Sequence, residues 1–489
     1  MIDRAHLELF EIRPVVVAAA SPDEPPKADS GSAISESPSS PPSAEAQADS
    51  PDEAGKLASP RKSVRDMLVP LGTDGLLLDG ERPGLLWLRI TVPADTPPGT
   101  YHGRVGFETE AGRTSARPLT VRVFDVSIAD PADYALGFDV WQLWSDLEHY
   151  YGVAAFSEDW WELVGTYLEH LAGMGARVAQ VGRAYFDWKR SAPGQWQFDF
   201  SRFDRYMSLC EKVGINKGIA YVAMLNTAAP TKVYYHDPDG EFHAIESEPG
   251  QDIYDEAWTA FADALFRHCR TRDWFHNLRV WVADRPQTDE ELATFKRAVD
   301  LLWAVNPDYQ VVATIDTAAA ASWLPEHADR FVLFGDQMPG QFGLLVASDR
   351  EATATTAICR TSAPHLAIGR DARDPYAVGP RALWGFLDAV VASTYLNWPE
   401  GFDVDAPEVP DGFSGLVYPS PTGPLMSLRA ERFAMGMADA ELWAMAGAEK
   451  TWAWWLGCGG EETAADLSNC VAEVREKALQ AVSRHQDAD

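Results

Sequence analysis

The sequence has few cysteines and no long apolar run. No stretch approaches the ~18 consecutive apolar residues that a membrane helix needs; runs such as LDAVVASTYLNW are short and interrupted. The cysteines show no metal-ligand spacing, so they predict free, mostly buried thiols in a reducing compartment, with no metal and no cofactor. There are five of them: Cys210, Cys269, Cys359, Cys458 and Cys470.

Basic residues are scarce relative to acidic ones. The 489 residues contain 41 Lys and Arg against 73 Asp and Glu, for a net charge of −32. This surface would repel a nucleic-acid backbone, so neither a nucleic acid nor a membrane is an expected partner. The N-terminus, MIDRAHLELFEIRPVVV, lacks the basic and apolar regions of a signal peptide, which predicts a cytoplasmic location.

Large apolar side chains are almost absent from residues 21–62, which consist mainly of Pro, Ser, Ala, Asp and Glu. Such a segment cannot offset its ordering entropy by burial, so we expect a disordered insertion. The β-like runs LELFEIRPVVV and LLWLRITV flank it. The insertion therefore interrupts one domain, predicted over residues 1–128.

An antiparallel β-pattern covers residues 85–126. Three alternating runs, LLWLRITVP, YHGRVGFET and ARPLTVRVFDV, are separated by the turns ADTPPGT and EAGRT. This pattern predicts a small β-sandwich-like domain. Only about four strands are visible where ~7 are usual, so the sandwich is expected to be incomplete.

After Asp130-Pro131, short apolar runs alternate with helical patterns. Eight runs and seven helices predict an α/β fold, a (β/α)8 TIM barrel over 129–448, followed by a helical extension over 449–489. A doubly wound sheet is the alternative, but no Gly-rich dinucleotide loop follows the first run. The expected strands are 135–141, 177–186, 217–225, 278–284, 310–316, 330–336, 365–370 and 389–398, and the expected helices are 157–174, 200–214, 253–271, 288–305, 318–328, 342–358 and 376–388.

Polar and aromatic residues stand at the ends of these predicted strands. In a (β/α)8 barrel the active site lies at the carboxyl ends of the strands. Carboxylates mixed with Trp and Tyr suit a sugar pocket, because aromatic rings stack on sugar faces and acids bind hydroxyls or act on the glycosidic bond. The strand-end residues are Asp139, Trp141, Tyr185, Asp187, Asn226, Asp284, Asp316, Asp336, Arg370, Asn397 and Trp398.

Several of these acids have a structural interpretation as well. Asp139 and Asp316 have the alternative role of capping the next helix. Asp187 is expected to be solvated in a polar loop. Thr288 and Glu291 form a T-x-x-E capping box, so Glu291 is predicted to be structural. His236, in YYHDPDGEFH, is expected in a surface hairpin.

Three segments together resemble glycoside hydrolase family 123 and its relatives. WLRITVPADTPPGTYHGRVGF resembles the β-domain of the family, and WQFDFSRFDRYMSLCEKVGI resembles the stretch before its third barrel strand. SGLVYPSPTGPLMSLRAERFAMGMADAELW resembles its C-terminal signature, with a Tyr-Pro pair and Ser-x-Arg-x-Glu. The resemblance covers roughly residues 63–447. It implies a β-sandwich followed by a (β/α)8 barrel, and hydrolysis of N-acetylhexosaminides, notably β-N-acetylgalactosaminides.

The resemblance also implies a catalytic Asp-Glu pair, usually followed by Pro, at the end of a barrel strand. The corresponding residues here are Asp284, Arg285 and Pro286. Asp284 retains the role of orienting the substrate's 2-acetamido group, whose carbonyl oxygen attacks the anomeric carbon. Arg285 stands at the position of the lost general acid, and its pKa above ~12 prevents it from donating a proton at neutral pH.

Two hypotheses follow from this substitution. In one, the chain hydrolyses N-acetylhexosaminides with an acid supplied from elsewhere, Asp336 or Asp187. In the other, it binds such sugars with little or no catalysis. Both predict a carbohydrate ligand, and the sequence does not indicate an oligomeric state. A further departure is the short N-terminus, since family members usually carry more β-structure before Leu7. The residues predicted to contact the sugar are Asp139, Trp141, Tyr185, Asn226, Asp336, Asn397 and Trp398.

Overall fold

The computed structural model describes most of the chain beyond its first 83 residues and parts of the N-terminal region. The described residues are 7–18, 62–71, 84–222, 224–226, 230–283, 286, 288–315, 328–334, 354–359, 366–370, 373–385, 387–392, 394–457 and 464–486. The predicted insertion lies outside these residues except for Lys62, which begins a strand.

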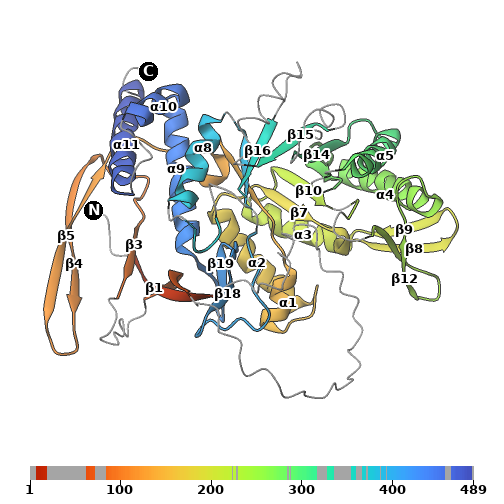
Figure 1. Cartoon of the computed structure of the whole chain (residues 1–489), viewed down its shortest axis with the longest axis horizontal. Coiled ribbons are helices and arrows are strands. Elements are labelled where there is room, and N and C mark those ends of the chain that lie inside the picture. Colours follow the sequence, from red (N-terminus) through yellow and green to blue (C-terminus); the bar gives the residue numbers. More distant parts are fainter. Residues whose placement is uncertain are drawn as a thin grey trace.

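One parallel sheet forms the centre of the molecule (Figure 1). Its eight strands follow the spatial order β6-β17-β16-β15-β14-β13-β10-β7, and every neighbouring pair is parallel. Parallel sheets are buried on both faces, which explains the short, apolar strand sequences. The strands are β6 (Gly137–Val140), β7 (Val178–Val181), β10 (Gly218–Val222), β13 (Leu278–Trp281), β14 (Gln310–Ile315), β15 (Arg330–Phe334), β16 (Ala354–Cys359) and β17 (Ala389–Ala392).

Strands β6 and β7 are the two ends of this sheet. No ladder joins them among the described residues; one isolated parallel bridge, Phe138 with Ala176, connects the two ends. There the N–H of Arg177 donates to the carbonyl of Phe138 at 3.2 Å. The fold is therefore mixed α/β, and the closed barrel predicted from the sequence is not confirmed.

Helices follow the strands largely where periodicity predicts them. They include α1 (Ser145–Tyr151), α2 (Glu158–Gly173), α3 (Ser201–Val213), α4 (Asp252–Thr271), α5 (Asp289–Val305) and α8 (Asp374–Trp384). The capping box is confirmed: the N–H of Glu291 donates to Thr288 Oγ1 at 3.2 Å, and Thr288 N–H donates to the Glu291 carboxylate at 3.1 Å. Glu291 thus begins α5 and has a structural role.

The predicted seventh strand is wrong. The described part of 365–370 is a turn that is held by Ile368 N–H donating to the Phe413 carbonyl at 2.8 Å. The strand in this position of the sheet is β16, which overlaps the end of the helix predicted over 342–358. Its sequence, ATTAIC, is rich in β-branched residues and pairs with β15 and β17.

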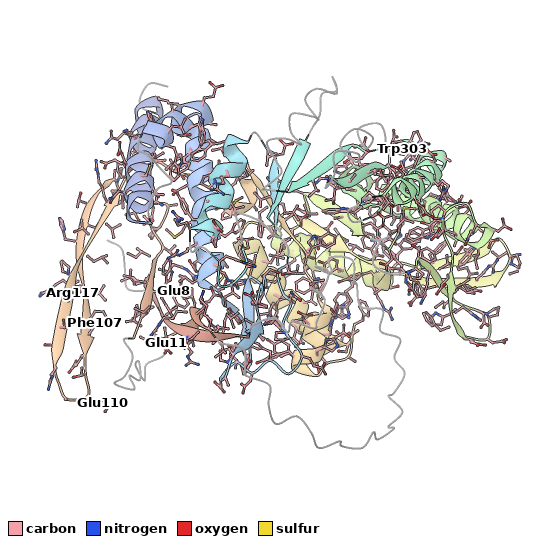
Figure 2. The ribbon with its side chains drawn as sticks, in the orientation of Figure 1. Glu8, Glu11, Phe107, Glu110, Arg117 and Trp303 are labelled. Atoms are coloured by element: carbon pink, nitrogen blue, oxygen red, sulfur yellow. The ribbon has the colours of Figure 1, made fainter. Side chains whose placement is uncertain are left out.

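The N-terminal strands form only part of the predicted antiparallel series: the second and third predicted runs pair with each other, but the first joins a different strand. β1 (Leu7–Ala18) pairs with β2 (Lys62–Pro70), β3 (Leu86–Ile90) and β18 (Glu408–Pro410). β4 (Gly99–Glu108) and β5 (Thr114–Val123) pair only with each other and form a long ribbon at one edge of the molecule, where Phe107, Glu110 and Arg117 lie (Figure 2). The β-sandwich is therefore not confirmed, because alternation identifies a strand but not its partner.

A second, four-stranded sheet is built from two hairpins that follow β7 and β10. Its order is β12-β11-β8-β9, with β8 (Asp187–Ala192), β9 (Gln195–Asp199), β11 (Lys232–His236) and β12 (Phe242–Glu246). The hairpin predicted around His236 is confirmed as β11–β12. Asp187 begins β8, so it does not lie in the polar loop that the sequence predicts.

The C-terminal region consists of β19 (Val417–Ser420), β20 (Gly423–Met426), α9 (Leu428–Ala446), α10 (Ala448–Gly457) and α11 (Ala464–Gln486). Trp443, Trp455 and Val474 form a buried apolar cluster between these helices, so α11 packs on α9 and α10. None of the described helices combines the length and the apolarity that crossing a bilayer requires.

The cysteines differ in part from the expected free thiols. Cys210 and Cys269 are buried and free. Cys470 is disulfide-bonded, which corrects the expectation for that residue. Sequence spacing could not predict this bond, because a disulfide depends on which cysteines meet in the folded chain.

Candidate functional site

The candidate site lies on the face of the parallel sheet that is turned away from the helices, near the carboxyl ends of its strands. The two-residue alternation of β6 places Asp139 and Trp141 on one side of the strand, whereas Phe138 and Val140 face the helices. Trp141 packs against Trp281, with ring centroids 4.9 Å apart and an interplanar angle of 43°. These two rings form a buried cluster with Val312, Val332 and Val391.

The two indoles differ in their hydrogen bonds. Trp281 Nε1–H donates to Thr314 Oγ1 at 3.4 Å. The Trp141 Nε1–H group is buried and has no hydrogen-bond partner in the described part of the chain. Leaving a buried donor unpaired costs roughly 1–3 kcal/mol. Each ring is only 3% exposed, so neither presents an open face to a ligand in this structure.

Asp139 lies deeper in the sheet than its predicted position at the mouth. It lines a cavity of about 260 Å³ together with Gly137, Val178 and Ala389, which lie at the starts of their strands. Burial raises the pKa of its carboxyl to about 7, although Val140 N–H donates to it at 2.7 Å and Arg279 and Arg177 oppose the rise. Asp139 does not cap a helix, because the residue preceding α1 is Trp144.

Asn397 and Trp398 lie in the loop after β17, and a single carboxylate holds both. Asp146 Oδ2 accepts the N–H of Asn397 at 2.6 Å and the N–H of Trp398 at 2.8 Å. Trp398 Nε1–H donates to the carbonyl of Val417 at 2.8 Å. Asn397 has a φ of 123°, a strained value for a residue other than glycine. The loop is therefore fixed by named contacts, with the Asn397 side chain exposed.

Tyr185 and Asn226 differ in accessibility. Tyr185 is buried, packs on Tyr206 with ring centroids 4.8 Å apart, and has a pKa raised well above its ordinary value by that burial. Asn226 is half-buried, and its N–H donates to Thr231 Oγ1 at 3.1 Å. Of these two side chains, only that of Asn226 has appreciable exposure to solvent.

Asp187 and Arg370 lie on other loops. Asp187 forms an ion pair with Arg202 at 3.1 Å. Arg370 is exposed in the turn after β16. Asp284, Arg285, Asp316 and Asp336 lie outside the described residues. The buried residues Ala283 and Pro286 flank the first two of them.

The sequence did not single out Gln142, which organises the end of β6. Its Nε2 donates to the Val178 carbonyl at 3.2 Å, its backbone N–H donates to Gln180 Oε1 at 3.1 Å, and its Oε1 accepts the hydroxyl of Tyr206. The feature of the sequence that could have indicated Gln142 is its position directly after Trp141. Gln142 thereby fixes the backbone beside this indole.

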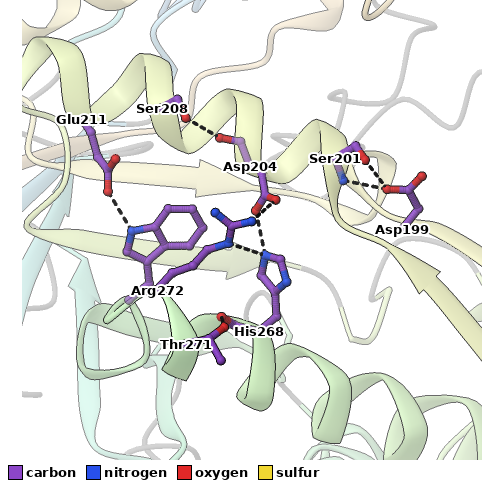
Figure 3. A network of polar contacts seen from close by, with 9 residues as sticks. Asp199, Ser201, Asp204, Ser208, Glu211, His268, Thr271 and Arg272 are labelled. Carbon is purple, nitrogen blue, oxygen red and sulfur yellow. Dashed lines mark hydrogen bonds and ion pairs between the residues drawn. The ribbon is translucent and has the colours of Figure 1, made fainter.

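A conspicuous polar network lies elsewhere, between α3 and α4 (Figure 3). His268 Nε2 lies 2.7 Å from Asp204 Oδ1, and Arg272 pairs with the other carboxylate oxygen. Ser208 is nearby, but its hydroxyl donates to the backbone carbonyl of Asp204 at 2.9 Å, so the three side chains do not form a nucleophilic triad. The network joins two helices and has a structural role.

Comparison with known proteins agrees with this architecture. Residues 141–359 match the glycoside hydrolase 123 catalytic domain. A family 123 glycoside hydrolase from Clostridium perfringens, described as hydrolysing glycolipid glycans, has 14% identity and a TM-score of 0.71, over 99% of this chain and 86% of that chain. No curated protein sequence matches.

Other solved structures are much less similar. An endo-β-1,4-mannanase from Thermotoga petrophila has 9% identity and a TM-score of 0.36, over 63% of this chain and 76% of that chain. A β-D-glucuronidase of Dictyoglomus thermophilum has 9% identity and a TM-score of 0.37, over 73% of this chain and 60% of that chain. These two scores are too low to add to the assignment. The match to the catalytic domain and the shared fold support a glycoside hydrolase family 123-like protein, and such a family implies a carbohydrate substrate.

Proposed function

We propose that this protein acts on β-N-acetylhexosaminides of the N-acetylgalactosamine or N-acetylglucosamine type. The observation that carries the proposal is the position of Asp284-Arg285-Pro286. These residues follow β13 within the matched catalytic domain, where the family resemblance implies an Asp-Glu pair. From the Clostridium perfringens relative we extend to this chain only the hydrolysis of a glycan. We do not extend the glycolipid that carries the glycan.

In the proposed reaction, Asp284 accepts the N–H of the substrate's 2-acetamido group. The acetamido carbonyl oxygen then forms a bond to the anomeric carbon as the glycosidic bond breaks, and water later opens the resulting ring. The leaving oxygen needs a proton, and Arg285 keeps its own at neutral pH. General acid catalysis is worth roughly 10²–10⁴ in rate, so poor leaving groups should react slowly.

We infer that the eight parallel strands close into a (β/α)8 barrel over residues 129–448. The bridge between Phe138 and Ala176 supports this inference because it joins the two ends of the sheet. Residues 1–128 then form a β-rich domain, joined to the barrel by the pairing of β1 with β18, and 449–489 form a helical extension. In a barrel, Asn226, Asn397 and Trp398 would surround the mouth where Asp284 acts.

A catalytically impaired sugar-binding protein is the second candidate. Arg285 favours it, because an adjacent cation keeps Asp284 ionised, which suits binding more than proton transfer. Asp336 and Asp187 remain the proposed replacement acids for the first candidate. Asp187 would have to leave its ion pair with Arg202 to donate a proton.

The test is the substitution Arg285→Glu. Wild type should cleave nitrophenyl N-acetylhexosaminides slowly and alkyl glycosides hardly at all. The variant places two carboxylates side by side, which raises the pKa of one of them and supplies an acid. Its activity should rise selectively on alkyl leaving groups. Arg267→Glu, on the exposed face of α4, is the matched control and should leave both rates unchanged.

The possible outcomes separate the two candidates. Rapid wild-type cleavage of natural disaccharides would mean that another residue donates the proton. Absence of activity in both proteins, together with binding of N-acetylgalactosamine, would support the sugar-binding protein. Absence of both activity and binding would refute the proposed function.

A further inference from the structure

The outer face of the four-stranded sheet carries a row of four side chains contributed by four different strands. The strand register places Phe242 beside His236, His236 beside Lys189, and Lys189 beside Gln197. Directly opposed residues in a sheet project on the same face, so these side chains are neighbours. We call this row the hairpin-sheet row.

The inner face of the same sheet is fixed to the rest of the molecule. Trp188 and Tyr235 are buried on that face, and Trp188 packs on Phe261 of α4 with ring centroids 4.6 Å apart. Alternation along β8 and β11 then requires Lys189 and His236 to face outward. The hairpin-sheet row is thus displayed on a rigid support.

Lys189 and His236 form an unusual cross-strand pair. The Lys189 ammonium is a cation, and the imidazole opposite it carries no negative charge to compensate it. In the described part of the chain, no hydrogen bond or ion pair is made by either side chain. The ring of His236 packs on the ring of Phe242, at 5.4 Å between centroids.

The neighbouring acids already have partners. Asp187 pairs with Arg202 at 3.1 Å, and Asp237 pairs with His243 at 2.9 Å. Asp199 accepts the backbone N–H of Ser201 at 2.8 Å as well as its hydroxyl. Lys189 is therefore an exposed cation without an ion-pair partner among the described residues, in a protein whose net charge is −32.

A cavity lies on this face between the two hairpins. Its volume is about 440 Å³, and its lining includes Lys189, Ser191, Gln197 and His236 as well as the two paired carboxylates of Asp187 and Asp237. Lys189, Ser191 and the amide of Gln197 are donors for an anionic group and for hydroxyls. At the end of the row, Phe242 has 40% of its surface exposed and stacks on Tyr234, with ring centroids 6.1 Å apart and an interplanar angle of 20°.

We propose that the hairpin-sheet row binds an acidic saccharide, with Lys189 and His236 receiving its carboxylate or sulfate and Phe242 contacting the face of a neighbouring sugar. Cations beside an exposed aromatic ring fit both parts of such a ligand. The inference rests on the proposed function, because it assigns an acidic glycan to a protein whose substrates are carbohydrates. The two hairpins follow β7 and β10, so the row lies on the side of the sheet where the strands end.

The experiment is calorimetric titration of the full chain with a chondroitin hexasaccharide, which alternates glucuronate and N-acetylgalactosamine. Its carboxyl-reduced form is the neutral control, and N-acetylgalactosamine alone probes the mouth of the sheet. Wild type should bind the acidic hexasaccharide roughly tenfold more tightly than the neutral one. This ratio is at the lower end of the gain in affinity expected from a charge-assisted contact near solvent. This preference should weaken in high salt.

The variants locate the effect. Lys189→Ala should abolish the preference for the acidic form, Lys189→Glu should reverse it, and Lys189→Arg should retain it. All three should bind N-acetylgalactosamine as wild type does. Lys296→Ala removes another exposed lysine, on α5, and should change nothing.

Equal wild-type affinity for the acidic and neutral forms would refute the inference. A preference that survives Lys189→Ala would refute it as well. If N-acetylgalactosamine binds but the acidic preference is absent, only this inference fails. If none of the three sugars binds, the inference and the proposed function fail together.

Discussion

The guanidinium of Arg429 and the carboxylate of Asp66 form a buried ion pair, with Arg429 Nε 3.0 Å from Asp66 Oδ2. The two side chains are 9% and 3% exposed. Arg429 also donates to the carbonyls of Leu366 and Gly415, and the hydroxyl of Tyr418 donates to Asp66 at 2.6 Å. The pair therefore joins β2 to the start of α9 and to the loops that follow β16 and β18.

This pair explains the Ser-x-Arg-x-Glu motif in physical terms. Ser427 caps α9 by accepting the N–H of Ala430 at 3.0 Å. Glu431, one helical half-turn after Arg429, pairs with Arg89 of β3. All three polar residues of the motif thus hold α9 in place or attach the N-terminal sheet to it. The motif therefore has a structural role.

Arg429→Met should destabilise the protein by roughly 3–5 kcal/mol, because it leaves the buried Asp66 carboxylate without its cation. Urea unfolding followed by tryptophan fluorescence measures the effect. Arg267→Met removes an exposed ion pair on α4 and should cost about 0–1 kcal/mol. If the two variants were equally stable, the buried pair would have no special role in joining β2 to α9.

Asp139 should make the stability depend on pH. Its pKa is about 7 in the folded protein against an ordinary value of 3.8, so the folded state retains a proton that the unfolded state has lost. Its contribution to stability is therefore full below about pH 3.8 and is lost as the pH rises through 7.

Asp139→Asn removes this dependence. At pH 8 the variant should be more stable than wild type by roughly 2–4 kcal/mol, since each pKa unit corresponds to about 1.4 kcal/mol. At pH 4 the difference should disappear. Thermal unfolding of both proteins between these pH values tests the expectation, and a stability difference that does not change with pH would contradict it.

Asp146→Ala should loosen the loop that carries Asn397 and Trp398. The loss of two hydrogen bonds to a carboxylate should cost roughly 2–4 kcal/mol. Hydrogen exchange should increase at the amides of Asn397 and Trp398 in particular. Glu158→Ala, which removes an exposed ion pair with Arg205, is the control and should leave exchange in this loop unchanged.

Asp284→Ala should weaken binding of N-acetylgalactosamine by roughly 1–3 kcal/mol, the cost of removing a partner of the acetamido N–H. Calorimetry on wild type and variant measures the change. Asp289→Ala, in the first turn of α5, is a nearby acid outside the proposed site and should bind as wild type does. Identical affinity of the Asp284 variant and wild type would remove Asp284 from the proposed site.

The sequence by itself determined the helices α2 to α5 and the capping box of Thr288 and Glu291, because these features depend on hydrogen bonds and periodicity within a few residues. It also identified most of the strands of the parallel sheet and placed Asp139 and Trp141 near the end of the first of them.

Only the tertiary structure decided which strands pair and where these side chains lie. β3 pairs with β1 instead of β4, and β16 takes the place expected for residues 365–370, because pairing depends on surfaces that are distant in sequence. Asp139 and Trp141 share one side of β6, and the cavity that Asp139 lines is also lined by Trp281, against which Trp141 packs. Asp66 and Arg429 are separated by 363 positions, so no local pattern could have revealed that they form one buried pair.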